Sequence, residues 1–224
     1  MSAPLLPVFV KLEGRPCLVV GGGVIGLQKV RSLLECGANV TVVAPDARDE
    51  IRDLDQRRKI AWRRRCYVSE DVLGQQLVIA ATNDPKVNHT IHGDAVAAGV
   101  LVNAVDDPPF CDFYFGSVVR RGPLQIGIST AGESPALAQR LRHQLEALLD
   151  KGTGPWLERL GALRREVLTV HPAGEKRNSL LRALATRDVC DLSTCPSRAM
   201  TVEAPTVEAP HKEQESDRGS WWLT

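Results

Sequence analysis

The stretch Cys17-Leu-Val-Val-Gly-Gly-Gly-Val-Ile-Gly26 decides the fold of this chain. An apolar strand over residues 17–20 runs directly into the glycine pattern Gly21-x-Gly23-x-x-Gly26, and a helix pattern and a second apolar strand at 40–44 follow. This order of strand, glycine turn, helix and strand is that of a βαβ unit that binds a dinucleotide. The pattern favours a nucleotide site, and the competing interpretation is a structural glycine turn.

Each part of this unit has an expected task at the cofactor. Gly21 permits the tight turn, Gly23 lets a pyrophosphate approach the backbone, and Gly26 lets the helix pack closely on the strand. The helix N-terminus offers N–H groups to the phosphates. The residues predicted to contact the cofactor are Gly21, Gly23, Val24, Ile25, Gly26, Pro45, Asp46 and Thr82.

Asp46 and Arg48 leave two questions open. Asp46 lies just beyond Pro45, about 20 residues after the glycines, where an acidic residue binds the ribose in many dinucleotide sites. A helix-capping role for Asp46 is an equal alternative. Arg48 nearby leaves the choice between NAD and NADP unsettled.

Composition excludes several classes of protein. The 224 residues carry a formal net charge of +1, which does not favour nucleic acid or a membrane surface as a partner. The sequence shows no signal peptide and no apolar stretch of transmembrane length, so we expect a cytoplasmic protein. The six cysteines fit buried free thiols in a reducing compartment, and a zinc site at Cys190 and Cys195 is the minor alternative.

The chain changes character at about residue 110. Before it, apolar strands at 17–20, 40–44, 60–62, 77–81 and 100–105 alternate with helical patterns, which predicts a Rossmann-like, doubly wound parallel α/β sheet. After it, a strand at 113–119 and an alternating strand at 124–128 flank a turn at 121–123. A helix then begins at Ser134-Pro135, with an apolar stripe of Leu137, Leu141, Leu145 and Leu148.

This pattern predicts four parts. We expect a nucleotide-binding domain at 1–112, a ribbon-plus-helix region at 113–150, and a small helical domain at 151–189 with helices at 156–170 and 179–185. A ribbon and one helix bury a leucine stripe poorly by themselves, so the stripe packs on the first domain or on a second copy. Residues 190–224, in which Thr-Val-Glu-Ala-Pro occurs twice, are expected to form a disordered tail.

Asp106 is the candidate for chemistry, because it follows the strand at 100–105 and the carboxyl edge of such a sheet opens onto the ligand crevice. Taken by itself, Asp106-Asp-Pro-Pro109 is more typical of a plain turn. His89 and His92 have a spacing that permits metal binding, but solvent exposure is the favoured interpretation, and no metal site is predicted.

Several segments together resemble one family. They are Gly21-Gly-Gly23, the run from Leu33 to Pro45, Ala80-Ala-Thr-Asn-Asp84, Val102-Asn-Ala-Val-Asp106, Gly116-Ser-Val-Val-Arg120, and Ile128-Ser-Thr-Ala-Gly-Glu-Ser-Pro135. Over residues 4–185 this looks like the siroheme synthase N-terminal module, also found alone as precorrin-2 dehydrogenase. The methyltransferase domain that some relatives carry is absent, and the 190–224 tail has no counterpart.

The resemblance implies a function and its residues. The family oxidises precorrin-2 to sirohydrochlorin with NAD, some members insert ferrous iron to give siroheme, and members are homodimers through the region matching 113–150. Asp106 matches the family's catalytic aspartate. The substrate carries eight carboxylates, so cations are expected around it, and the predicted substrate contacts are Asn103, Arg120, Ser129, Thr130 and Arg140. Each arginine alone is more typical of a solvated surface. The alternative function is an NAD-sensing regulatory module without catalysis.

Overall fold

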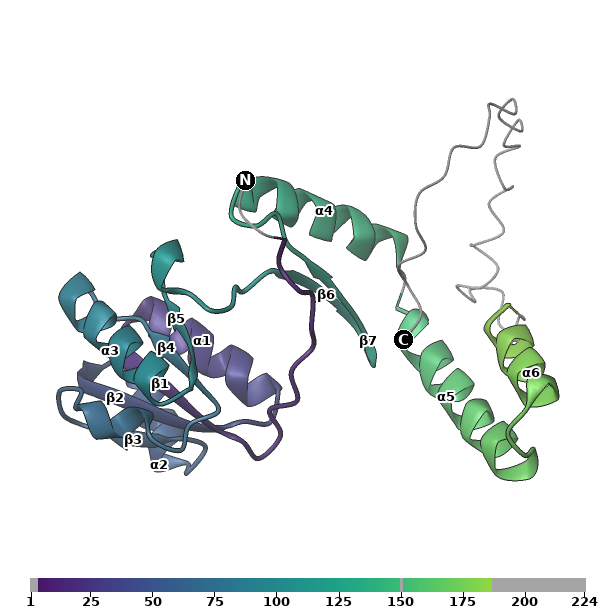
Figure 1. Cartoon of the computed structure of the whole chain (residues 1–224), viewed down its shortest axis with the longest axis horizontal. Coiled ribbons are helices and arrows are strands. Elements are labelled where there is room, and N and C mark those ends of the chain that lie inside the picture. The colour runs from purple at the N-terminus through teal and green to yellow at the C-terminus, as the bar shows by residue number, and fades with distance from the viewer. Residues whose placement is uncertain (1–3, 150, 187–224) are drawn as a thin grey trace, which may run out of the picture. The chain divides into compact units, whose positions relative to one another are not determined.

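A computed structural model describes residues 4–149 and 151–186 of the chain (Figure 1). Contacts group the described residues into two units, one of residues within 1–117 and 128–139 and the other of residues within 118–127 and 140–186. The first unit holds, in chain order, β1 (Pro16–Gly22), α1 (Val24–Glu35), β2 (Asn39–Ala47), α2 (Asp49–Gln56), β3 (Ala61–Arg63), the 3₁₀ turn η1 (Ser69–Val72), β4 (Leu77–Ala80), α3 (Pro85–Ala97), β5 (Leu101–Ala104) and the 3₁₀ turn η2 (Pro108–Phe110).

The predicted doubly wound sheet is confirmed. Its five strands are parallel in the order β3-β2-β1-β4-β5, and Val19 of β1 is in register with Val42 of β2 and Ile79 of β4. The chain places β2 and β3 on one side of β1 and then β4 and β5 on the other side. In such sheets ligands bind outside the carboxyl ends of the strands at this switch point, here between β1 and β4.

Successive residues of the central strand β1 pack into two cores, one on each face of the sheet. Cys17 and Val19 pack with α1 and α2, whereas Leu18 and Val20 pack with α3. Because both faces are covered, β4 is buried along its whole length, which explains why its sequence is a continuous apolar run. Two predicted helix boundaries are also confirmed. Gly37 ends α1 with a φ of +74°, and Asp84 caps α3 by accepting a hydrogen bond from the Lys86 N–H.

The strand predicted at 113–119 is corrected. The structure has β6 at Ser117–Arg121, and residues 113–116 are not in a strand. The cause is a set of bonds to β5. The Asp112 N–H donates to the Val102 carbonyl at 2.8 Å, and the Asn103 amide donates to the Phe113 carbonyl at 2.7 Å. These contacts hold 112–113 beside the sheet before the chain can enter the ribbon.

The ribbon itself is confirmed as a two-stranded sheet of β6 and β7 (Leu124–Ile128), joined by a tight turn at Gly122. Along β7 the residues alternate between half-buried and exposed, as the sequence predicts. Arg121 joins this ribbon to α4 (Pro135–Leu148), because its guanidinium donates to the Glu146 and Leu149 carbonyls, each at 2.8 Å. Such bonds satisfy carbonyls that a helix end leaves without partners.

Two helices follow and pack against each other (Figure 1). They are α5 (Thr153–Val170) and α6 (Glu175–Thr186), and each begins three or four residues earlier than the sequence pattern indicates. The predicted tail at 190–224 and the Cys190–Cys195 pair lie outside the described residues. Among the described helices, none combines the length and apolar character needed to cross a membrane.

Candidate functional site

The glycine loop between β1 and α1 has the geometry of a pyrophosphate cradle. A Cβ on Gly21 would lie 2.3 Å from the Ala81 carbonyl oxygen, and one on Gly26 would lie 2.1 Å from the Gly21 oxygen. Both positions therefore exclude a side chain. A Cβ on Gly23, in contrast, would meet nothing within 4 Å, so the loop faces open space where a phosphate can approach.

The N-terminus of α1 provides donors at this open space. Its first backbone hydrogen bond runs from Leu27 to the Gly23 carbonyl, so the N–H groups of Val24, Ile25 and Gly26 precede the helical ladder. Gly23, Val24 and Ile25 are exposed. Free N–H groups and the helix dipole suit a dinucleotide's phosphates, and the loop therefore fits the predicted cofactor.

The end of β2 lies directly against the loop. The Arg48 N–H donates to the Gly22 carbonyl at 3.0 Å. Asp46 is exposed and accepts a hydrogen bond from Arg52 at 2.7 Å. The Ala47 N–H and the Arg52 guanidinium hold the pKa of Asp46 below its usual range. The helix-capping alternative for Asp46 is wrong, because the N-cap of α2 is Arg48.

Thr82 follows β4 on the same edge and is held by a residue that the sequence analysis missed. The Thr82 hydroxyl donates to the Asn88 side-chain oxygen at 2.7 Å, and the Asn88 amide donates back to the Thr82 carbonyl at 3.2 Å. Asn88 is a buried polar residue of α3. The signal for it was present, since a polar residue beside the apolar Val87 and Ile91 needs partners inside the fold.

Asp106 follows β5 in a backbone conformation that is uncommon for residues other than glycine and that aspartate adopts more readily than most. Its φ is +61°, in the left-handed region, and its side chain is exposed. Such a conformation is typical of an aspartate in a tight turn. Asp106 therefore makes the turn and also presents a carboxylate at the carboxyl edge, and its catalytic role stays a prediction.

Side chains from α3 hold the turn that follows Asp106. Asp107 lies 2.7 Å from the His89 Nε2 atom, and it makes no side-chain cap of η2. The His89 ring stacks on Phe110 with centroids 3.8 Å apart, and His92 meets the same ring edge-on at 5.1 Å. His89 is exposed, as the sequence analysis expects, and it also links α3 to the Asp106 turn.

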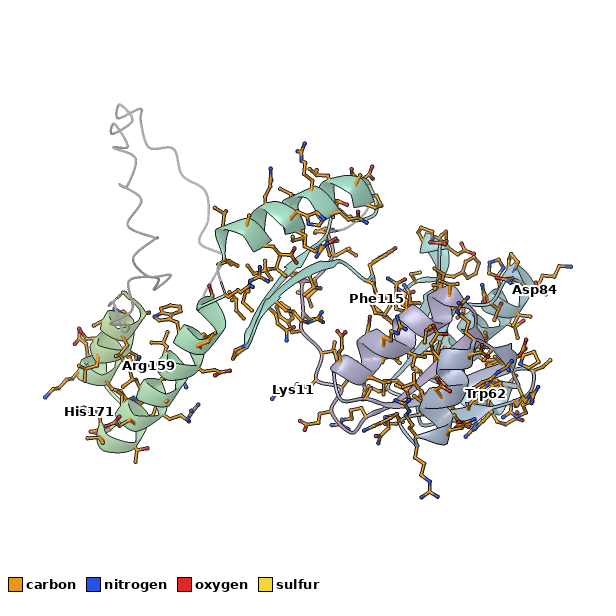
Figure 2. All side chains as sticks on the ribbon, turned by 180° about the vertical axis from the view of Figure 1, so that it is seen from behind. Lys11, Trp62, Asp84, Phe115, Arg159 and His171 are labelled. Atoms are coloured by element: carbon orange, nitrogen blue, oxygen red, sulfur yellow. The ribbon has the colours of Figure 1, made fainter. Side chains whose placement is uncertain are left out.

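Lys29 of α1 lies near the Asp106 turn, and the sequence analysis did not single it out. Its ammonium lies 3.7 Å from the centre of the Phe115 ring, a residue labelled in Figure 2. Burial lowers the pKa of Lys29, and attraction to Asp106 and Cys111 opposes part of that effect. Lys29 therefore places a positive charge near the Asp106 carboxylate.

Asn103, predicted to contact the substrate, lies inside the fold. It is 7% exposed, and its amide contacts the Phe113 carbonyl at 2.7 Å and the Cys111 sulfur at 3.3 Å. These bonds give it the task of fixing the segment after Asp106. Contact with the substrate stays a prediction that this burial does not support.

Ser129 and Thr130 form the loop before α4. Their hydroxyls accept bonds from the Ala131 and Ser134 N–H groups, both at 3.2 Å. Ala131 has a φ of +50°, so this loop is also strained. The Ser134 hydroxyl caps the helix by accepting from the Leu137 N–H, which leaves Ser129 and Thr130 as loop residues whose contact with the substrate stays a prediction.

The predicted substrate cations Arg120 and Arg140 are both exposed. They belong to the second unit, whereas the glycine loop, Asp106 and Thr130 belong to the first. Nearby cations are already engaged, because Arg142 pairs with Glu146 at 2.7 Å and Arg121 binds the carbonyls at the end of α4. Contact of Arg120 and Arg140 with the substrate stays a prediction.

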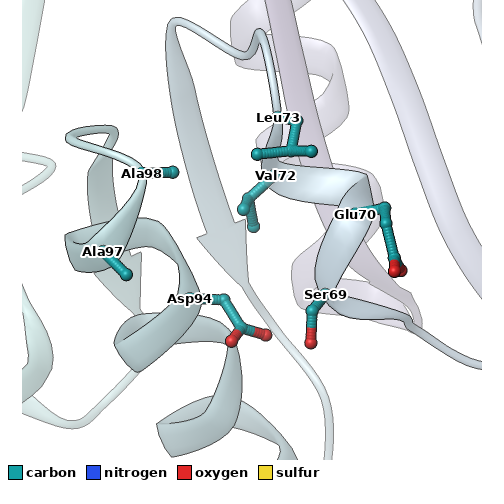
Figure 3. Close-up of a pocket in the computed structure, with 7 residues that line it drawn as sticks. All are labelled: Ser69, Glu70, Val72, Leu73, Asp94, Ala97 and Ala98. Carbon is teal, nitrogen blue, oxygen red and sulfur yellow. The ribbon is translucent and has the colours of Figure 1, made fainter.

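A shallow pocket of about 280 Å³ lies elsewhere in the sheet unit (Figure 3). Residues of η1 and of the end of α3 line it, among them Ser69, Leu73, Asp94 and Ala98. Both segments lead into the amino ends of β4 and β5. The pocket is therefore at the opposite edge from the glycine loop and does not belong to the candidate site. The described residues contain no group of three or more His, Cys, Asp and Glu side chains placed to hold a metal ion.

Comparison with known proteins agrees with this arrangement. A family model for NAD(P)-binding domains matches residues 8–117, and a model for the central part of sirohaem biosynthesis proteins matches residues 121–148. The siroheme synthase of Methylococcus capsulatus is 36% identical over 217 residues, which are 96% of this chain and 45% of that protein. The siroheme synthase of Psychrobacter arcticus is 42% identical over 161 residues, which are 72% of this chain and 29% of that protein.

A solved structure covers nearly the whole fold. The structure of SirC, a precorrin-2 dehydrogenase, superposes with a TM-score of 0.71 at 28% sequence identity. The match spans 87% of this chain and 96% of SirC. The chain spans less than half the length of the curated siroheme synthases quoted above and nearly all of SirC.

Proposed function

Since the chain belongs to the family of siroheme synthase N-terminal modules, we propose that it oxidises precorrin-2 to sirohydrochlorin with NAD. The observation that carries the proposal is the shared carboxyl edge of the sheet. The glycine loop after β1 and Asp106 after β5 both lie there. A dinucleotide site and an exposed carboxylate on one edge suit a dehydrogenation.

The reaction removes a hydride and a proton from the substrate and yields NADH. NAD supplies the acceptor for the hydride. Asp106 takes the proton, because it is an exposed carboxylate at the crevice edge and a general base must reach solvent to release what it accepts. Lys29 supports it with a nearby positive charge, and Asn103 and His89 hold the segments on either side.

Iron insertion is a second candidate activity for the same edge. Sirohydrochlorin loses two pyrrole protons when ferrous iron enters the ring, and the exposed Asp106 carboxylate is able to accept a proton in that step too. Ferrous iron is then a substrate and needs no resident metal site.

We also infer that the protein is a homodimer through residues 113–150. Leu137 is 37% exposed and Leu148 is 76% exposed, while Leu141 and Leu145 are half-buried. The inward residues of β7 are likewise only half-buried. An apolar helix stripe and a ribbon face that the chain covers poorly suit a second copy of the same surface.

An absorbance scan of the purified protein tests these activities together. Addition of precorrin-2 and NAD is expected to give the spectrum of sirohydrochlorin together with NADH, and later addition of ferrous iron reports any siroheme. A protein that binds NAD but leaves precorrin-2 unchanged would instead be the NAD-sensing module.

A further inference from the structure

A cation of α1 lies beside the Asp106 turn without a bonded anion. Lys29 is half-buried, and its ammonium is 3.7 Å from the centre of the Phe115 ring (labelled in Figure 2). Hydrogen bonds and ion pairs to this ammonium are absent among residues 4–149 and 151–186. An ammonium has three N–H donors, and the contact with the ring face leaves donors that an anionic ligand can use.

Contacts from the strand that leads to Asp106 fix the position of this ammonium. The buried Asn103 of β5 donates to the Phe113 carbonyl at 2.7 Å. The Phe113 ring packs on the core under α1 and meets the Phe115 ring edge-on, with centroids 5.6 Å apart. Phe115 in turn lies against Lys29. The ammonium is therefore held in a set relation to the Asp106 carboxylate.

The ammonium has lost water that its neighbours do not replace. Burial lowers the pKa of Lys29, and attraction to Asp106 and Cys111 offsets only part of that effect. Cys111 adds no negative charge at neutral pH, because burial raises the pKa of its thiol. A partly desolvated cation of this kind is stabilised when a further anion binds to it.

Two exposed aromatic side chains follow each other in the same segment. Phe115 is 42% exposed and Tyr114 is 41% exposed. The Tyr114 hydroxyl donates to the Pro108 carbonyl at 3.3 Å, which ties this side chain to η2 next to the Asp106 turn. Exposed rings beside a cation suit a ligand that is flat and apolar at its centre and anionic at its rim. A polycarboxylated tetrapyrrole has this chemistry.

We propose that Lys29 and Phe115 form a binding subsite for the tetrapyrrole substrate. The ammonium binds one carboxylate at the rim, and the exposed part of the Phe115 ring contacts the macrocycle. Because Lys29 lies near Asp106, this contact places the macrocycle beside the proposed base. The inference rests on the proposed oxidation of precorrin-2. It adds a substrate contact within the first unit, whereas the predicted contacts Arg120 and Arg140 belong to the second.

Titration with sirohydrochlorin, without NAD or metal, tests the subsite by binding alone. Lys29→Met keeps the methylene chain and removes the charge, so the dissociation constant from tryptophan fluorescence quenching should rise about tenfold, as expected for one lost charge-assisted bond. Lys29→Arg keeps a cation that stacks on aromatic rings, so its dissociation constant should stay within about threefold of wild type. Lys59→Met removes an exposed charge between α2 and β3, at the opposite edge of the sheet, and should leave the affinity unchanged.

Further measurements separate a substrate contact from a structural role. In Lys29→Met, NAD affinity and melting temperature should stay near wild type. Raising salt from about 50 to about 500 mM should weaken sirohydrochlorin binding less in this variant than in wild type, because one ion pair is missing. Phe115→Leu removes the ring under the ammonium and should weaken sirohydrochlorin binding by about threefold.

The inference is overturned if Lys29→Met binds sirohydrochlorin as tightly as wild type does. Equal losses in Lys29→Met and Lys29→Arg, or in Lys29→Met and Lys59→Met, would also overturn it. So would an equal loss of NAD affinity in Lys29→Met, because α1 itself would then be disturbed. A wild-type protein that binds NAD and does not bind sirohydrochlorin would instead contradict the proposed function.

Discussion

The sheet unit and the ribbon with its helices bury their apolar residues very differently. Leu18, Val19 and Val42 are fully buried in the sheet unit, and most residues of its strands β1, β2, β4 and β5 are buried. Beyond residue 105, the buried apolar residues of the described chain are Val119 and Ala138. The first unit therefore has a core of its own, whereas the second exposes the surface that a partner would cover. The proposed cofactor site lies in the first unit, and the proposed dimer contact lies in the ribbon and α4.

The largest expected effect is the loss of the proposed dimer when the α4 stripe is charged. Leu141→Glu with Leu145→Glu places charges on the α4 stripe, which a dimer interface cannot bury without cost. We expect light scattering at micromolar concentration to give the monomer mass, while calorimetry still detects NAD binding. Gln144→Glu, on the exposed side of the same helix, is the control. A wild-type protein that is monomeric under these conditions contradicts the proposed dimer.

The next effect distinguishes two glycines within one loop. Gly23→Asp adds a carboxylate in open space where the pyrophosphate is expected, so NAD affinity should fall by about 100-fold or more while circular dichroism stays near wild type. Gly26→Ala adds a methyl group 2.1 Å from a backbone oxygen, so it should lower the melting temperature as well. Unchanged NAD affinity in Gly23→Asp would remove the cofactor assignment.

The fold was predictable wherever its signal was local. The glycine turn, the end of α1 at Gly37 and the cap at Asp84 depend on residues within one turn of each other, and all three are as predicted. The start of β6 was wrong, because it is set by Asn103, ten residues before its bonding partner Phe113. A strand pattern does not reveal such a side-chain bond.

In the candidate site, too, local features were predictable and long-range contacts were not. Asp106, Asp46 and the glycines follow predicted strands, so their common edge could be predicted from the order of elements. Their partners could not, because His89 meets Asp107 across 18 residues and Lys29 of α1 meets Phe115, which follows η2 much later in the chain. Such contacts depend on how helices pack on the sheet, and periodicity reports only which face is apolar.

A smaller effect concerns a buried ion pair that stabilises the sheet unit. Asp71 is a buried carboxylate that accepts bonds from Arg63 and Arg65, all between 2.6 and 2.7 Å. Burial raises its pKa, but the hydrogen bonds from Arg65, the Val68 N–H and Arg63 outweigh that and hold the pKa below its usual range. Asp71→Asn should therefore cost about 2 kcal/mol of unfolding free energy at neutral pH.

The sign of the pH dependence follows from the lowered pKa. Asp71 contributes its full stabilisation above its unfolded pKa of about 3.9, and this is lost as pH falls through the lower folded value. Urea titrations should show the gap between wild type and Asp71→Asn closing below about pH 4. A gap that is constant from pH 7 to pH 2.5 would mean that the ion pairs do not stabilise the unit.

The smallest expected effect concerns the contact that holds the Asp106 turn. His89→Ala removes the contact with Asp107 and the stacking on Phe110, so kcat for precorrin-2 oxidation should fall about tenfold with little change in KM. His89→Gln keeps a nitrogen near the Nε2 position and should recover most of the rate. Equal losses in both variants would show that the ring itself, rather than its bond to Asp107, matters.

The central claim is that Asp106 accepts the proton when precorrin-2 is oxidised. Asp106→Asn keeps the shape of the side chain and removes its basic oxygen. Asp107→Asn is the neighbouring control, and it should retain most activity because its amide oxygen still accepts a bond from His89. Sirohydrochlorin formation at saturating NAD, followed by absorbance, should fall by about 100-fold or more in Asp106→Asn, with NAD affinity and molecular mass unchanged. Any iron insertion by the wild type should fall in the same variant. Oxidation of precorrin-2 at the wild-type rate by Asp106→Asn would contradict the claim and leave Asp106 as a turn residue.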